Sequence, residues 1–149
     1  MKRIFVILAL ALAVSGAAQG QVISSGSPVS GASVALSAKG VTISTTGDQG
    51  TIAVPSYITK YGVASFVVTN CSGTPLAAQV ALFTGAGGTG TTVVAAGTIT
   101  GATSATAMVT PTVTALTTAL TASSLFVRIA VQNVAAITCD FYAVVNNLS

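Results

Sequence analysis

The residues of this sequence that come closest to a known chemical motif are GAGGTG at positions 85–90. They match G-x-G-x-x-G, the fingerprint of a turn that holds a dinucleotide pyrophosphate at the start of a helix. Such a site needs a strand before the glycines, a helix after them, and an acidic residue about 20 positions further on. Here a strand-like AQVALFT precedes, but the β-branched TTVVAAG follows, and the only acid beyond residue 48 is Asp140. The sequence therefore predicts a hairpin loop between two strands and no nucleotide cofactor.

Catalytic and metal-binding side chains are scarce in the rest of the chain. It has no histidine and only two acidic residues, Asp48 and Asp140, which removes the commonest general base and the commonest transition-metal ligand. Asp48, in TTGDQG, has the setting of a turn residue, and Asp140 alternates outward beside Cys139 as a solvated strand residue. Serine and threonine are frequent, but none has a recognisable activating base. We expect no catalytic residues, no metal site, no cofactor and no enzymatic activity.

Cys71 and Cys139 are the only two cysteines. In an exported protein two cysteines favour a disulfide, and the alternative is a pair of buried free thiols. A bond would form if the first and last strands of the 57–149 region were neighbours, because paired strands bring Cα atoms within disulfide range.

PSYITKYG (55–62) places Tyr57, Lys60 and Tyr61 together. Two aromatic rings and a cation could form a surface for a sugar or a stacked base. Packing where the chain enters a strand accounts for the same residues, and we favour it. Tyr57, Lys60 and Tyr61 are nevertheless the candidate ligand surface, with the 85–90 loop as the other region that a ligand could use.

These residues lie among short segments that alternate apolar and polar side chains. The predicted strands are 63–70, 78–84, 91–100, 106–110, 124–132 and 137–145. Their expected inward residues are Phe66, Val68, Val80, Leu82, Leu125, Val127, Ile129, Val131, Ile137, Cys139, Phe141, Ala143 and Val145. One stretch, 114–124, is ambiguous, because two leucines lie four apart among many threonines, which argue against a helix. Short strands separated by turn residues indicate an all-β protein, an antiparallel β-sandwich of jelly-roll or Greek-key type.

Two regions precede that sandwich. A positive start, an apolar run from Ile4 to Val14 and small residues up to Ala18 have the layout of a secretory signal peptide, residues 1–18. Cleavage after Ala18 or after Gly20 fits this pattern, and the run is too short for the ~20 residues of a membrane span. Residues 19–56 are rich in serine and glycine and predict an extended arm or linker with weak strands. The sandwich domain is then expected at 57–149, with Pro55 near the boundary.

Charge is unusually rare. Charged residues make up 5% of the chain, against about 25% in an ordinary soluble domain. Without the leader the net charge is +1, from Lys39, Lys60, Arg128, Asp48 and Asp140. Nucleic-acid binding requires a clustered basic patch, which is not present here. A net charge near zero promotes association, so the expected partners are further copies of the chain or a larger protein assembly.

Three segments resemble small tailed-phage virion proteins with a β-sandwich fold. They are SYITKYGVASFVVTNCSG, VALFTGAGGTGTTVVAAGTITGAT and SLFVRIAVQNVAAITCDFYAVV, within residues 57–149. The shared pattern is a VVTN-type strand, a hairpin with GGT and VVAA, a late SL strand and a closing DFY strand. The leader and the cysteine pair depart from that pattern. The resemblance implies a β-sandwich with a structural role and carries over no functional residues.

Together these observations predict a non-enzymatic structural or surface protein, of virion or decoration type. It would be secreted, periplasmic or extracellular, on a virion surface if derived from a phage, and without a membrane anchor once the leader is cleaved. A secreted carbohydrate-binding module is the alternative.

Overall fold

The computed structural model describes residues 31–103 and 107–149. The predicted signal peptide, residues 19–30 of the predicted arm, and Thr106 of the predicted 106–110 strand lie outside the described residues.

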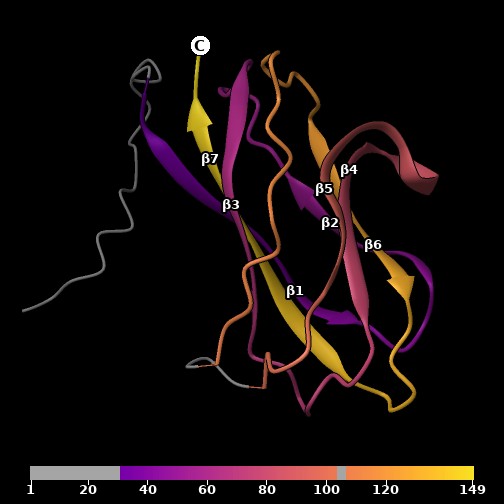
Figure 1. Cartoon of the computed structure of the whole chain (residues 1–149). Helices are drawn as coiled ribbons and strands as arrows, with labels where there is room; N and C mark the ends of the chain where they lie inside the picture. Colours follow the sequence, from indigo (N-terminus) through magenta and orange to yellow (C-terminus); the bar gives the residue numbers. More distant parts are fainter. Residues whose placement is uncertain (1–30, 104–106) are drawn as a thin grey trace, which may run out of the picture.

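Within these described ranges, seven strands form two antiparallel sheets that face each other (Figure 1). One sheet has the order β1-β7-β3, and the other has the order β2-β6-β4-β5. The strands are β1 (Ser33–Thr42), β2 (Gly47–Ala53), β3 (Tyr61–Thr69), β4 (Gln79–Gly85), β5 (Thr89–Thr98), β6 (Ser124–Val131) and β7 (Thr138–Asn147). The predicted all-β antiparallel sandwich is confirmed.

The core lies between the sheets and follows the alternation of the strands. In β7 the residues Cys139, Phe141, Ala143 and Val145 are all fully buried, as expected when every second side chain faces the opposite sheet. Phe141 stacks on Phe66 of the neighbouring β3, with ring centroids 5.9 Å apart. Among the expected inward residues Val131 differs, because it ends β6 and is 42% exposed.

The region predicted as an arm supplies one strand to each sheet. β1 pairs with β7 from Ser33 to Thr42, and β2 pairs with β6 from Gly47 to Ala53. Weak strands were expected within this region, but it was not expected that they would belong to the two sheets of the sandwich. The sandwich therefore begins before the boundary expected near Pro55. Only one face of these strands packs on the core, so the other face keeps small polar residues. This explains why the serine-rich composition resembles that of a linker.

Residues 107–121, which we call the strap, run along one open side of the sandwich. Val109 and Leu120 each form a bridge with β3, at Val68 and Tyr61, whereas Val113 bridges Val94 of β5. The strap thus connects the edges of both sheets. The strand expected at 106–110 is wrong over its described residues, where only isolated bridge residues, Ala107 and Val109, occur. Residues 114–124 are not helical.

Candidate functional site

The glycine-rich loop joins two antiparallel strands, β4 and β5, through a single 3-10 turn at Ala86–Gly88. A strand follows the loop, as predicted, where a dinucleotide site needs a helix. The amide of Gly87 donates a hydrogen bond to the carboxylate of Asp48. The Asp48 carboxylate therefore already occupies one of the loop amides that a phosphate would use.

Asp48 and Arg128 hold this loop against the sheet. They are registered partners on β2 and β6, with Arg128 Nη1 3.0 Å from Asp48 Oδ1. The expectation that Asp48 is a simple turn residue is wrong, since it lies within β2. It joins three elements, β2, β6 and the loop, through one carboxylate. The Arg128 side chain is 35% exposed and that of Asp48 is 22% exposed, so the ion pair itself contributes little, up to about 1 kcal/mol.

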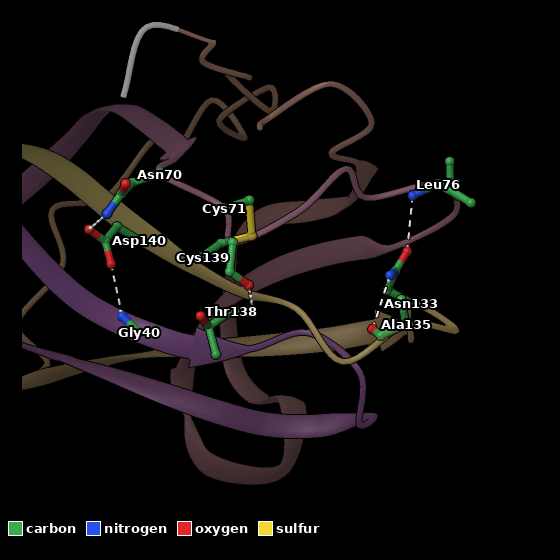
Figure 2. Close-up of a disulfide and its surroundings, with 10 residues drawn as sticks. Gly40, Asn70, Cys71, Leu76, Asn133, Ala135, Thr138, Cys139 and Asp140 are labelled. Atoms are coloured by element: carbon green, nitrogen blue, oxygen red, sulfur yellow. Dashed lines mark hydrogen bonds between the residues drawn. A yellow bond between two sulfur atoms is a disulfide. The ribbon is translucent and has the colours of Figure 1, made fainter. Parts of the chain in front are cut away.

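Asp140 is the second carboxylate, and it also has structural partners. Its side chain accepts hydrogen bonds from the Gly40 amide at 2.8 Å and from Asn70 Nδ2 at 3.0 Å (Figure 2). Asp140 is only 9% exposed, so the expectation of a solvated side chain is wrong. The reason is a bulge in β1 between Ala38 and Val41, which brings Gly40 to the carboxylate. The hydrogen bonds from Asn70 and then from Gly40 lower the pKa of Asp140, and Lys39 adds to this, whereas burial opposes it.

The disulfide between Cys71 and Cys139 is formed, with the Cα atoms 4.0 Å apart (Figure 2). Cys71 lies in the segment after β3, and Cys139 lies in β7. The strands β3 and β7 are antiparallel neighbours. Both the predicted pairing and the strand adjacency on which it depends are confirmed. Cys71 is 5% exposed and Cys139 is 0% exposed, so the disulfide lies in the core and links β7 covalently to the segment after β3.

The candidate ligand surface at Tyr57, Lys60 and Tyr61 does not form as a pair of exposed rings. Tyr57 and Lys60 are exposed, but Tyr61 is fully buried, and its hydroxyl donates to the Ala122 carbonyl at 3.0 Å. Burial raises the pKa of Tyr61 to about 12. The structural interpretation of Tyr61, as a core residue where β3 begins, is correct.

An open groove of about 360 Å³ lies beside this segment, between β3 and the strap. It exists because the strap bonds to β3 at Tyr61 and Val68 and leaves the strand between them. No local sequence pattern indicates this groove, because its shape depends on where the strap crosses to β5. Its lining carries no charged side chain and consists of Gly62, Val63, Ala64, Val113, Thr114, Ala115, Leu116, Thr117, Thr118, Ala119 and Leu148.

Asn133 is a structural polar residue that the sequence did not single out. It is 2% exposed, accepts a hydrogen bond from the Leu76 amide at 2.9 Å and donates one to the Ala135 carbonyl at 3.1 Å (Figure 2). It ties the β3–β4 and β6–β7 loops together at the end of the sandwich that carries the disulfide. These loops expose Leu76 and Val134, by 73% and 95%.

Searches against protein families, curated proteins and solved structures find no match to this chain. Among residues 31–103 and 107–149, no group of three or more His, Cys, Asp or Glu side chains could hold a metal ion. That same part of the chain contains no helix long and apolar enough to cross a membrane.

Proposed function

We propose that the chain is an exported, non-enzymatic structural or surface protein that works by associating with other protein subunits. The virion and decoration-type proteins that its sequence resembles would be the matching class. Its compartment would be periplasmic or extracellular.

The observation that carries this proposal is the use of both carboxylates in the fold. Asp48 binds Arg128 and the loop amide of Gly87, and Asp140 binds Asn70 and the Gly40 amide. These are the only acidic residues, and the chain has no histidine. Acid–base chemistry by a carboxylate would have to take Asp48 or Asp140 from its structural partners, which favours a structural role.

Two further features support export and assembly. The buried disulfide fits an oxidising compartment. Without residues 1–18 the net charge would be +1, and the exposed residues are mostly serine, threonine, alanine and glycine. Both features favour contact between subunits over mutual repulsion.

The experiment measures the mass and the oligomeric state of the exported protein. Intact-mass spectrometry should give a chain that begins at Gln19 or Gln21, less the two hydrogens lost on forming the disulfide. Light scattering after size-exclusion chromatography should show a mass that grows with concentration. A chain that keeps residues 1–14, or a monomer at every concentration, would contradict the proposal.

A carbohydrate-binding module remains the second candidate, and the groove beside β3 is what favours it. Thr114, Thr117 and Thr118 line the groove, and Tyr57 is exposed on the segment leading to β3. A strict monomer that binds a glycan array, and loses that binding in Leu116→Trp, which would fill the groove, would establish this function instead.

A further inference from the structure

The two sheets have four edge strands, β1, β3, β2 and β5, and the described residues cover only β3 and β5. The strap bonds to the outer side of β3 at Tyr61 and Val68, and Thr114 of the strap donates to the Val93 carbonyl of β5. In the part of the chain that the structure describes, the outer sides of β1 and β2 have no backbone hydrogen bond. Unpaired strand edges of this kind are templates for another strand.

The direction of the backbone groups along β1 follows from one hydrogen bond. The Asn147 amide of β7 donates to the Ala32 carbonyl at 2.9 Å. Because hydrogen-bonded and non-hydrogen-bonded pairs alternate in an antiparallel ladder, Val34 and Leu36 also face β7. The N–H and C=O groups of Ser33, Ala35 and Ser37 therefore point away from the sheet, into the space beside β1.

This part of β1 lacks the charge, the proline and the bulge that commonly protect an edge strand. Residues 33–38 are SVALSA, with no charge, no proline and no bulge. The bulge and the charge, at Lys39 and Gly40, come only after this run. β2 differs, because it carries Asp48 and has a bulge between Asp48 and Gly50.

We propose that residues 33–37 of β1 pair antiparallel with the same residues of a second copy, around a twofold axis at Ala35. The inference deepens the proposed function, on which it rests, by naming the partner and the surface. The two three-stranded sheets would then form one continuous six-stranded sheet.

The sequence of β1 is self-complementary in this register, as a twofold interface requires. Ser33 lies opposite Ser37 of the other copy, and Ala35 lies opposite itself, so only small side chains meet on the outer face. On the inner face Val34 lies opposite Leu36, which extends the apolar core. Lys39 lies opposite Gly31, so the axis brings no like charges together.

The test compares proline at equivalent positions of the two open edges in the full exported chain. Ala35→Pro removes an N–H that faces the second copy and makes no bond to β7. Thr51→Pro is the matched control, because the Val54 amide bonds to the Ser123 carbonyl and the alternation turns Thr51 outward from β2. We expect Ala35→Pro to weaken self-association at least tenfold in analytical ultracentrifugation, and Thr51→Pro to leave it unchanged.

A charge swap tests the register independently of proline. Ala35 is exposed, so Ala35→Lys and Ala35→Glu should both fold, with circular dichroism as the check. Each variant alone should be monomeric, because like charges meet at the axis, and an equimolar mixture should dimerise.

The outcomes distinguish a failure of the β1 interface from a failure of the proposed function. If Ala35→Pro and Ala35→Lys associate as the wild type does, β1 is not the interface, and the proposed function stands. If the wild type is monomeric at every concentration, both are overturned. If that monomer also protects the amides of Ser33, Ala35 and Ser37 from hydrogen exchange, the chain's own N-terminal segment covers this edge.

Discussion

The side-chain amide of Asn70 donates to the carboxylate of Asp140 across 3.0 Å, and it links the residue after β3 to the middle strand of its sheet. On the other side the same carboxylate accepts the Gly40 amide from β1. Asp140 therefore connects all three strands of the β1-β7-β3 sheet through one side chain. Asn70 takes a positive φ of 50° to make this contact, a conformation that asparagine tolerates better than most residues.

This arrangement predicts an acid-sensitive contribution to stability. The pKa of Asp140 is lowered in the folded protein, so its contribution is fully present above the unfolded value of about 3.9. It is lost as the pH falls through the lower, folded value, because the unfolded chain then binds the proton more readily. Urea unfolding of the wild type between pH 6 and pH 2 should show this loss.

Variants at Asp140 and Asn70 test whether Asp140 causes this loss of stability at low pH. Asp140→Ala should reduce the free energy of unfolding by about 1–3 kcal/mol at pH 6, since two donors lose their acceptor. Asn70→Gly keeps the positive φ and removes the first donor, so it should make the acid loss smaller. An acid transition of the same size in Asp140→Ala would show that another group causes it.

Tyr61 predicts a transition at the opposite end of the pH scale. Burial raises its pKa to about 12, above the usual value of about 10. Its contribution to stability is therefore present below pH 10 and is lost as the pH rises toward 12. In an ultraviolet titration, one of the three tyrosines should ionise at a pH about two units higher than the usual tyrosine value. Tyr61→Phe should remove this late step and cost about 1 kcal/mol, through the lost bond to Ala122.

The disulfide should account for a large part of the total stability. Cys71 and Cys139 are 68 positions apart, and constraining a loop of that length in the unfolded chain stabilises the fold by about 2–5 kcal/mol. The double variant Cys71→Ala/Cys139→Ala should lower the urea midpoint accordingly. Reductant should lower the midpoint of the wild type and leave the double variant unchanged, and equal midpoints for all four samples would contradict this.

Features that depend on one strand at a time were predictable from the sequence. The alternation in β7 and β6 identified the inward residues, and the same alternation placed Cys139 in the core. The cysteine pairing followed once β3 and β7 were assumed to be neighbours. The hairpin at the glycine loop followed from the β-branched residues on its far side.

Features that depend on distant segments were not predictable. Asp140 looked solvated because its partner Gly40 lies 100 positions away, on a bulge that no local pattern indicates. Tyr61 looked available to a ligand because the strap that covers it, at Leu120, comes from the other half of the chain. β1 and β2 looked like a linker because their serine- and glycine-rich sequence forms strands only through pairing with β7 and β6.

The glycine loop gives the last prediction, which uses two glycines with nearly equal φ. Gly87 and Gly90 have φ of 71° and 72°, so both resist a side chain for the same backbone reason. A Cβ on Gly87 would meet nothing within 4 Å, whereas one on Gly90 would lie 2.5 Å from Thr84 Oγ1 and 3.1 Å from the Gly85 nitrogen. Thr84 Oγ1 cannot easily move away, because it accepts the Thr91 amide at 2.8 Å.

Gly87→Ala should therefore cost about 1 kcal/mol of unfolding free energy, which is the strain of a positive φ alone. Gly90→Ala should cost more than about 2 kcal/mol, because a steric clash is added to that strain. Urea unfolding of the two variants measures the difference. Equal costs would mean that the hairpin relaxes around Thr84. Adenine nucleotides should leave the melting temperature of the wild type unchanged; a rise that Gly87→Ala abolishes would restore the dinucleotide interpretation of the motif.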